Sequence, residues 1–365
     1  MNEFYNEQKN LTAAKIEFYQ NYIEIYLIKL LMGFKKCFIT DLFCGAGKNG
    51  NNLGSPLVLI DRAKYVLAIP QLKNNAQIYI LFNDKDKGNI DNLEVELKNV
   101  AVSENINIYP IKNKNFEDIL PLVLKQLKEK ITPKFFFLDP FTYSDVKMKH
   151  LMEIMSLKNT EILLFLPAFH AYRFASDKNL KKDHKTRIFL EEFTEEGVFD
   201  YENIDDFLLS IKNKLRKELG LDFVRPILLD GGARKNSLFL ITKNQDGMML
   251  MNNIALKKSE DGKGVNIKGS RQGTLFGTSG TPKFKQFSLN LSEEIRKKGQ
   301  MTNLEIIKFT IIEEFLPKHA KLVLLDLIRR DKVRAFDQLG NKISKSTKFC
   351  IAEKVKAVSI FKYVP

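Results

Sequence analysis

The chain has 365 residues, of which 44% are hydrophobic, and it carries a formal net charge of +14. This length allows two domains with ordinary cores, whereas Lys29, Lys35 and Lys36 interrupt the longest apolar stretch and exclude a membrane-spanning helix there. Three cysteines without a C-x-x-C pair, four scattered histidines and a polar N-terminus predict a cytoplasmic protein with reduced thiols and no metal site.

Strands and helices alternate through the first half of the chain. An amphipathic helix is expected over residues 14–31. Buried strands are predicted at residues 37–40, 77–82, 106–109, 134–138 and 161–166. Helices between them are predicted at residues 55–68, 89–100, 116–130 and 144–155. Because strands that alternate with helices form a parallel sheet covered on both faces, we expect a doubly wound α/β fold.

The most informative segment is residues 40–47, TDLFCGAG, directly after the first strand. Its glycines fit the dinucleotide-binding pattern G-x-G-x-x-G, but that pattern requires a helix to begin on the third glycine. Here the helix signal comes later, with Ser55 as N-cap and Pro56 as the first helical residue. A Walker phosphate loop lacks its first glycine and the Ser or Thr after Lys48. The two remaining interpretations are the first motif of S-adenosylmethionine methyltransferases, D-x-F-x-G-x-G, and a plain structural turn.

Polar residues follow the ends of the strands, which lie side by side at one edge of a doubly wound sheet. Asp41 ends the first strand and Asp84 follows the second. A carboxylate has two acceptor oxygens, so Asp84 can accept both hydroxyls of a ribose. Asn115 and Phe116 follow the third strand and can place an amide and a ring beside an adenine. A solvated turn is the alternative for Asp84.

The fourth strand ends in the segment Asp139-Pro140-Phe141-Thr142-Tyr143. This segment resembles the (N/D)-P-P-Y motif of amino-methyltransferases. The resemblance implies that Asp139 holds an exocyclic amine and that Phe141 or Tyr143 stacks on a base. The second proline of the motif is absent, and a proline turn over packed aromatic residues is the alternative. A nucleobase acceptor must leave its duplex or come from a single strand.

The remaining sequence predicts additions to the sheet and a second domain. Two strands at 222–229 and 237–242, joined by a short Gly-rich connection, are expected to form an antiparallel pair at the sheet edge. A segment rich in Gly, Ser, Thr and Lys is expected to be a linker. The expected boundaries are 1–258 for the first domain, with a helical insertion at about 176–218, then 259–283 for the linker and 284–365 for the second domain.

The C-terminal segment has the pattern of a winged helix, which is helix, helix and hairpin. Thr302 and Glu305 are the pair of a capping box at the start of one helix. Pro317 breaks that helix, and a second helix follows it. Residues 334–349 are expected to form the hairpin, with Gly340 and Asn341 at its tip.

Positive charge is concentrated in this segment. Residues 281–365 hold 18 Lys and Arg against 9 Asp and Glu, a net of +9 out of the chain's +14. Such a surface suits a polyanion such as DNA or RNA, and a lysine-rich codon usage is the alternative explanation. The side chains expected to face a phosphate backbone are Arg329, Arg330, Lys332, Arg334, Lys342, Lys345 and Lys348.

These motifs together resemble the three-Cys-motif partner proteins, bacterial proteins with a methyltransferase-like sheet. The match covers roughly residues 10–255. It includes Lys15, residues 41–47, Gly54-Ser55-Pro56-Leu57, Asn83-Asp84, Asp139-Pro140-Phe141 and residues 240–243. The family usually has Pro where Ala46 stands and Gly where Thr142 stands. The resemblance implies a class I methyltransferase-like Rossmann fold with a C-terminal winged-helix domain. It also implies a Gp37/Gp68-like partner, a candidate iron-sulfur protein, in mobile-element or defence loci.

The leading expectation is an S-adenosylmethionine-dependent methyltransferase-like protein that acts on nucleic acid. The expected cofactor-binding residues are Asp41, Phe43, Gly45, Gly47, Asp84, Asn115 and Phe116, and the expected catalytic residues are Asp139, Phe141 and Tyr143. Methyl transfer depends mainly on alignment, so a site without a strong base is sufficient. The alternatives are a non-catalytic nucleic-acid-binding subunit and a metal nuclease that uses Asp84, Asp86 and Asp139.

Overall fold

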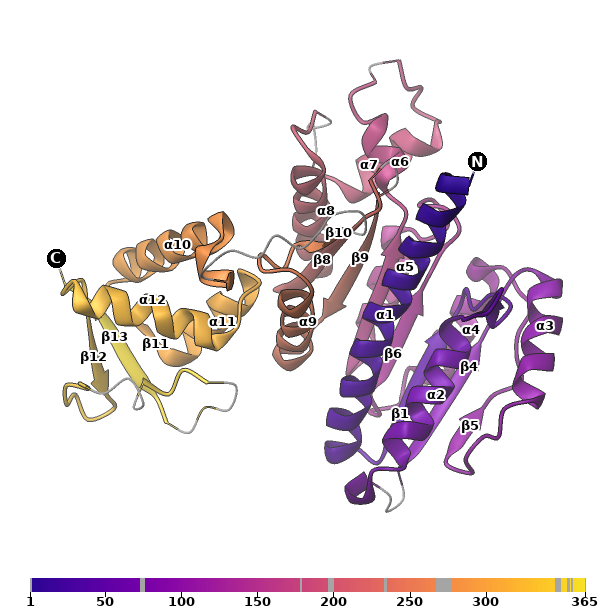
Figure 1. Ribbon diagram of the computed structural model, residues 1–365, viewed down its shortest axis with the longest axis horizontal. Helices are drawn as coiled ribbons and strands as arrows, with labels where there is room; N and C mark the ends of the chain where they lie inside the picture. Colours follow the sequence, from indigo (N-terminus) through magenta and orange to yellow (C-terminus); the bar gives the residue numbers. More distant parts are fainter. Residues whose placement is uncertain are drawn as a thin grey trace. The chain divides into compact units, whose positions relative to one another are not determined.

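A computed structural model gives the conformation of most of the chain (Figure 1). It describes residues 2–72, 76–177, 179–195, 200–232, 235–266, 277–344, 349–352, 355 and 357–364, with side chains from Leu11 onward. The chain divides into two compact units, residues 1–244 with 265–269, and residues 245–264 with 270–365. Each unit is described by itself below. In the part of the chain that the structure describes, no helix is long and apolar enough to cross a membrane.

The first unit is built on an eight-stranded sheet. Its spatial order is β10-β8-β9-β7-β6-β1-β4-β5. Strands β5, β4, β1, β6 and β7 pair in parallel, whereas β9 pairs antiparallel with both β7 and β8. The strands are β1 (Lys36–Asp41), β4 (Gln77–Phe82), β5 (Ile106–Ile108), β6 (Lys134–Leu138), β7 (Thr160–Leu166), β8 (Phe223–Asp230), β9 (Lys235–Thr242) and β10 (Gly264–Asn266).

The parallel strands follow the order third, second, first, fourth, fifth along the chain, which is the order of a doubly wound sheet. The predicted α/β fold with a mostly parallel sheet and an antiparallel edge pair is therefore confirmed. From β1 the chain first builds outward through β4 and β5 and then crosses to β6 on the other side. The order thus reverses between β1 and β6, where open α/β sheets bind their ligands.

Helices cover both faces of the sheet. They are α1 (Asn2–Gly33), α2 (Ser55–Leu67), α3 (Lys87–Lys98), α4 (Phe116–Leu127), α5 (Met148–Ser156), α6 (Phe169–Arg173), α7 (Lys185–Phe193) and α8 (Ile204–Leu219). Figure 1 shows α1 and α2 side by side over one face. The alternation of β6 explains this, because Phe135 and Phe137 pack against Tyr19 of α1, while Phe136 joins the core on the other face.

The predicted helical insertion is only partly separate from the sheet. Phe207, Ile211 and Leu215 of α8 are fully buried in the main core, and α8 packs against α5 and β8. This helix is therefore the ordinary crossover between β7 and β8. The segment with α6 and α7 departs from the repeating strand–helix pattern.

The second unit contains four helices and a small antiparallel sheet of order β11-β13-β12 among its described residues. The elements are α9 (Gln245–Lys258), the 3-10 turn η2 (Gly277–Gly280), α10 (Pro282–Lys298), β11 (Gln300–Thr302), α11 (Asn303–Ile312), α12 (Pro317–Arg329), β12 (Val333–Asp337) and β13 (Ser359–Tyr363). The predicted capping box is present, since the Thr302 hydroxyl accepts from the Glu305 amide and the Glu305 carboxylate accepts from the Thr302 amide.

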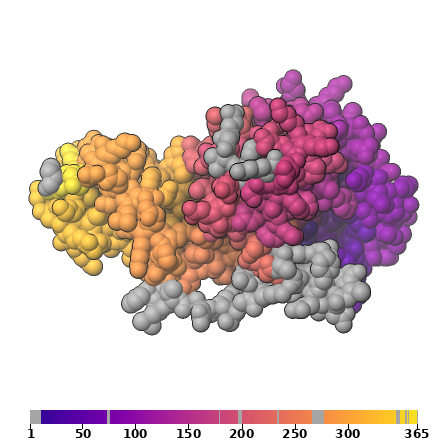
Figure 2. Space-filling model, turned by 90° about the horizontal axis from the view of Figure 1, so that it is seen from above, coloured from indigo at the N-terminus to yellow at the C-terminus, as the bar shows by residue number. Residues whose placement is uncertain are grey.

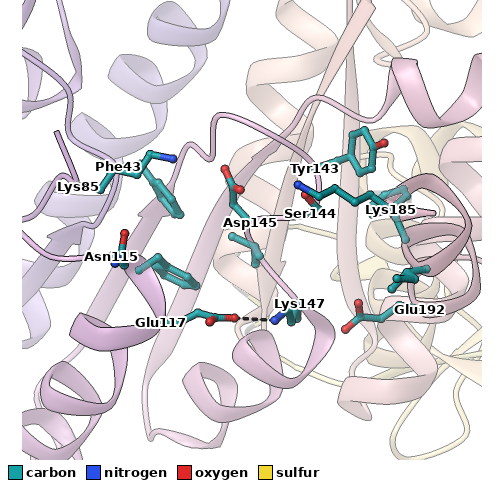
Figure 3. Close-up of a pocket in the computed structure, with 14 residues that line it drawn as sticks. Phe43, Lys85, Asn115, Glu117, Tyr143, Ser144, Asp145, Lys147, Lys185 and Glu192 are labelled. Carbon is teal, nitrogen blue, oxygen red and sulfur yellow. Dashed lines mark hydrogen bonds and ion pairs between the residues drawn. The ribbon is translucent and has the colours of Figure 1, made fainter. Parts of the chain in front are cut away.

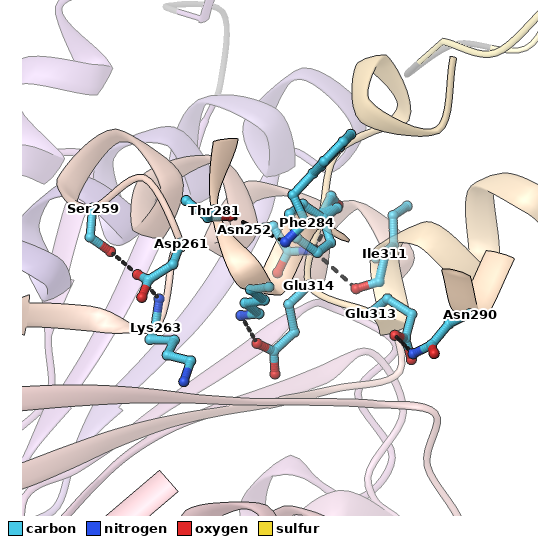
Figure 4. Close-up of polar contacts among 12 residues, drawn as sticks. Asn252, Ser259, Asp261, Lys263, Thr281, Phe284, Asn290, Ile311, Glu313 and Glu314 are labelled. Atoms are coloured by element: carbon cyan, nitrogen blue, oxygen red, sulfur yellow. Dashed lines mark hydrogen bonds and ion pairs between the residues drawn. The ribbon is translucent and has the colours of Figure 1, made fainter. Parts of the chain in front are cut away.

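Helix α9 groups with this unit through one buried amide (Figure 4). The side chain of Asn252 donates to the carbonyl of Ile311, in the last turn of α11, at 3.0 Å and to that of Phe315, which follows the helix, at 3.1 Å. The Ile311 carbonyl also accepts from the Glu314 amide at 3.0 Å, so the Asn252 amide adds a second donor at the helix end. The domain boundary predicted at residue 258 separates α9 from this unit, because a hydrogen bond between residues 59 positions apart leaves no local pattern in the sequence.

The predicted hairpin at 334–349 is present only near its tip among the described residues, where the Asp337 amide donates to Asn341, the Ile343 amide donates to Ala335, and Lys342 forms a bridge with Phe336. The regular partner of β12 is β13 at Ser359–Tyr363, and residues 345–348 lie outside the described residues. The predicted tip is a local turn in which Asp337 accepts from the amides of Leu339 and Asn341. The Gly340-Asn341 pair that predicts a turn does form one, but the strand that pairs along the whole of β12 lies further along the chain.

Candidate functional site

The loop after β1 is anchored by Asp41. Its carboxylate is fully buried and accepts a hydrogen bond from the Ser55 hydroxyl at 2.6 Å and a longer one from the Phe43 amide at 3.4 Å. The sequence predicts Ser55 as the N-cap of α2, and this prediction is wrong. Gly54 holds that position without a side-chain cap, because the Ser55 hydroxyl is committed to the buried carboxylate.

The glycines of the loop close a small hairpin, β2 (Lys48–Asn49) with β3 (Asn52–Leu53). Gly47 has φ +82°, and a Cβ placed there would lie 2.9 Å from a methyl carbon of Leu93. The Gly54 amide donates to the Gly47 carbonyl at 2.7 Å. No helix begins at the third glycine, so the loop lacks the geometry that dinucleotide binding requires. Gly45, with φ +64°, faces open space.

Asp84 and Asn83 connect the end of β4 to the loop after β1. Asp84 is 1% exposed, and its carboxylate accepts from the Gly45 amide at 2.9 Å and from the Asp86 amide at 2.8 Å. The Asn83 side chain donates to the carbonyls of Leu42 and Lys114. Two loops from different strands are thus fixed at the carboxyl edge of the sheet by the side chains of the two residues that follow β4.

Asp139, at the end of β6, forms a part-buried ion pair with Lys15 of α1 at 2.5 Å. The ammonium of Lys15 also lies 4.4 Å from the centre of the Phe165 ring. Burial, together with the nearby Asp139 carboxylate, raises the pKa of Asp41 to about 7, and the Ser55 hydrogen bond opposes this rise. Asp41, Asp139 and Lys15 therefore form one electrostatic group between β1 and β6.

The thiol of Cys44 lies close enough to both Asp41 and Asp84 for their charges to affect its pKa. Burial raises the pKa of Cys44 well above its ordinary range, and the negative charges of Asp41 and Asp84 raise it further. Of the three carboxylates predicted from the strand ends, Asp41 and Asp84 accept from amides of the loop after β1, and Asp139 lies near Asp41. Their oxygens point mainly toward protein donors rather than toward solvent.

A cavity of about 440 Å³ opens beside this group (Figure 3). Four residues of the predicted site line it: Phe43, Asn115, Phe116 and Tyr143. The rings of Phe43 and Phe116 stack with centroids 4.9 Å apart. Asp41, Asp84 and Asp139 are not part of the cavity lining that the structure describes, nor are Gly45 and Gly47.

Charged side chains complete the cavity lining and were not predicted. Figure 3 shows Lys85 and Asn115 on one side and Tyr143 and Lys185 on the other. Lys147 forms an ion pair with Glu117 at 2.6 Å, and the Glu192 carboxylate accepts from the Met148 amide at 2.5 Å. These residues come from α4, α7 and the loop before α5, so only the tertiary fold brings them together.

The aromatic residues after Asp139 diverge. Phe141 is 59% exposed, and the Lys85 ammonium lies 5.2 Å from its ring centre. Tyr143 lines the cavity, and its hydroxyl lies 2.8 Å from the Thr186 hydroxyl of α7. Phe141 thus presents a ring to solvent, whereas Tyr143 is held against the cavity wall.

The predicted phosphate-facing residues of the second unit differ in their surroundings. Arg329, Lys332 and Lys342 are exposed. Arg330 pairs with Asp326 at 3.0 Å, and Arg334 pairs with Asp331 at 3.2 Å. Lys345 and Lys348 lie outside the described residues. Within the described chain, no group of three His, Cys, Asp or Glu side chains stands close enough to hold a metal ion.

The comparisons with known proteins give distant similarities of fold. No protein-family model matches the chain, and no curated protein matches it. A candidate O-methyltransferase from Klebsiella pneumoniae is similar at 12% identity and TM-score 0.32, over 60% of this chain and 78% of that one. The SAH-bound methyltransferase PaMTH1 from Podospora anserina is similar at 13% identity and TM-score 0.27, over the same shares. Membership of the three-Cys-motif partner family stays a prediction.

Proposed function

We propose that the protein is an S-adenosylmethionine-dependent methyltransferase-like protein that acts on nucleic acid. The observation that carries the proposal is the cavity of about 440 Å³ at the carboxyl edge of the doubly wound sheet, lined by Phe43, Asn115 and Phe116. Its volume lies within the range of small-molecule sites, and its lining combines aromatic rings with polar and charged side chains.

Each part of the site has a role in this proposal. The rings of Phe43 and Phe116 contact the adenine, and Asn115, an exposed amide, bonds its edge. Asp84 receives the ribose hydroxyls in place of the Gly45 amide, which now occupies one of its oxygens. Open space beside Gly45 leaves room for this exchange.

The remaining residues serve the methionine end and the acceptor. Asp41 and Gly47 shape the loop, and the Asp41 carboxylate adds negative charge near a cationic ligand. Asp139 orients an acceptor amine, with Phe141 and Tyr143 as rings beside the base. S-adenosylmethionine, when bound, supplies the activated methyl group. The protein's own contribution is alignment and exclusion of water.

The second candidate function is a nucleic-acid-binding subunit without chemistry. One observation favours it: Asp84 is 1% exposed and both of its oxygens accept from backbone amides. A carboxylate in this state holds a loop and does not need a ligand. In this case the helix, strand, helix, helix, strand, strand order of α10 to β13 would serve as a winged-helix domain on nucleic acid.

Calorimetric titration of the full-length protein with S-adenosylmethionine separates the two candidates. We expect the wild type to bind, and Asp84→Ala to weaken binding by about tenfold or more, which corresponds to about 1.4 kcal/mol. Asp91→Asn, an exposed carboxylate on α3, is the control and should leave the affinity unchanged. The absence of heat from the wild type at millimolar ligand would refute the enzyme and leave the binding subunit.

A further inference from the structure

A chain of aromatic rings is exposed beside the cavity. His170 of α6 stacks on Tyr143 with ring centroids 6.0 Å apart and an interplanar angle of 19°. Phe174 follows, 4.9 Å from His170 and 39% exposed. Phe141, two residues before Tyr143 in the chain, is 59% exposed. Adjacent exposed rings of this kind mark an interaction site.

Cations are frequent in the same stretch of the chain. Residues 169–187 hold six Lys and Arg against two Asp and Glu. Arg173, the last residue of α6, is exposed, as are Lys181 and Lys182 between α6 and α7, and Lys185 lines the cavity. Figure 2 views the molecule from the side on which α6 and α7 lie in Figure 1, and part of this stretch is exposed there.

We propose that this region binds single-stranded nucleic acid and leads it to the cavity. The rim surface is defined by Phe141, His170, Arg173, Phe174, Lys181 and Lys182. Exposed rings stack on unpaired bases, and lysines and arginines neutralise the phosphates, which is how proteins hold single strands. A duplex hides its base faces, so this combination favours the single strand.

The inference deepens the proposed function and rests on it for the role of the strand. An acceptor base must be unpaired before a methyl group reaches it. The rim surface adjoins the cavity through His170, which stacks on the cavity-lining Tyr143 and in turn contacts Phe174. A strand held there has one base at the cavity mouth. The sequence analysis placed nucleic-acid contacts in the C-terminal segment, so this surface of the first unit is a second, separate one.

The test is fluorescence anisotropy of the full-length protein with a labelled oligothymidine of about 12 nucleotides and with a duplex of the same length, a size within the range of single-strand sites. Lys181→Glu with Lys182→Glu should weaken binding of the single strand by about tenfold and reduce the slope of log affinity against log salt by roughly 0.7 for each lost phosphate contact. His170→Ala with Phe174→Ala should weaken it by about fivefold or more without changing that slope.

The matched control is Lys125→Glu with Lys128→Glu. Both lysines are exposed at the C-terminal end of α4, toward the opposite edge of the sheet from the cavity. The inference is overturned if this control weakens the single strand as much as the rim variants, or if single strand and duplex lose affinity equally. It is also overturned if polyglutamate displaces the oligothymidine as well as unlabelled strand does, because the surface then selects acidic protein.

Titration of the same variants with S-adenosylmethionine keeps the two proposals apart. The rim variants should bind it as the wild type does, because none of the substituted side chains lies in the predicted cofactor site. If the wild type binds the oligothymidine but not S-adenosylmethionine, the proposed enzyme fails while the single-strand surface stands. If it binds only S-adenosylmethionine, the surface is refuted and the enzyme stands.

Discussion

Two opposing effects act on the charge of the Asp41 carboxylate. It lies at the carboxyl end of the central strand, fully buried, where the Ser55 hydroxyl and the Phe43 amide favour its charged form. Burial and the neighbouring Asp139 disfavour that form, and burial prevails, so its pKa rises to about 7. The residue therefore changes charge close to neutral pH.

This shift predicts a pH dependence of stability. The folded protein keeps the Asp41 proton up to about pH 7, whereas the unfolded chain releases it near the ordinary value of 3.8. Between these values the folded state binds more protons, so the free energy of unfolding falls as pH rises and levels off above about 7. The fall is on the order of 4 kcal/mol, since each pKa unit corresponds to about 1.4 kcal/mol.

Asp41→Asn should remove this slope, because the amide oxygen still accepts from Ser55 and carries no charge. The measurement is hydrogen exchange of peptides from β1 and β6 at about pH 4.5 and 7.5, corrected for intrinsic rates, which reports the first unit by itself. Asp91→Asn should keep the wild-type slope. An equal slope in wild type and Asp41→Asn would show that Asp41 titrates normally.

At the scale of elements, the glycine loop divides into one part fixed by packing and one part open to solvent. A Cβ at Gly54 would lie 2.9 Å from the backbone carbonyl oxygen of Gly47, to which the Gly54 amide donates at 2.7 Å. Gly45 meets nothing within 4 Å and needs glycine only for its φ of +64°. Similar glycines in one motif thus have different physical reasons.

Alanine substitutions should distinguish the close approach at Gly54 from the backbone conformation at Gly45 by their effects on stability. Gly54→Ala forces apart two backbone segments and should destabilise the first unit by about 2 kcal/mol, as overpacking does. Gly45→Ala carries only the left-handed backbone cost of about 1 kcal/mol. Thermal unfolding followed by circular dichroism measures both. Greater destabilisation by Gly45→Ala than by Gly54→Ala would contradict the described close approach.

The sequence predicts the interior strands well and the edges less well. Strands β4 and β6 agree with the predicted residues because their near-continuous apolar runs can only be buried. The partner of β12 was missed because pairing across 21 intervening residues leaves no local signal. Helix α8 was assigned to an insertion because its charged exposed face hid the apolar stripe of Phe207, Ile211 and Leu215.

The candidate site was predictable where it depends on strand ends. Asp41 and Asp84 bond one loop, and Asp139 lies near Asp41, because parallel strands place their carboxyl ends at one edge. Their partners could not be read from sequence. Lys15 lies 124 residues from Asp139, and Lys185 reaches the cavity from a helix in a separate segment. Tertiary packing alone brings such residues together.

At the scale of the whole molecule, charge is distributed unevenly between the two units. The C-terminal quarter carries a net +9 of the total +14. Ion pairs already occupy Arg330 and Arg334, so the exposed cations Arg329, Lys332 and Lys342 are the better candidates for phosphate contact. If both proposals hold, the rim surface binds single strands and this basic region binds duplex.

This division predicts that charge reversal on α12 mainly weakens duplex binding, whereas charge reversal on the rim surface mainly weakens single-strand binding. Arg329→Glu with Lys332→Glu should weaken binding of a duplex of about 20 base pairs and reduce its salt slope by roughly 0.9 for each lost phosphate contact. It should affect oligothymidine less than the rim variants do. Anisotropy titrations from about 50 to 200 mM salt measure both effects.

Lys285→Glu with Lys297→Glu is the matched control for this prediction, because both lysines are exposed on α10 of the same unit and the net charge changes equally. Long-range attraction responds to net charge, whereas a phosphate contact requires a particular side chain at the interface. If the α10 and α12 variants lose duplex affinity equally, only net charge acts, and the winged-helix assignment of α12 loses its support.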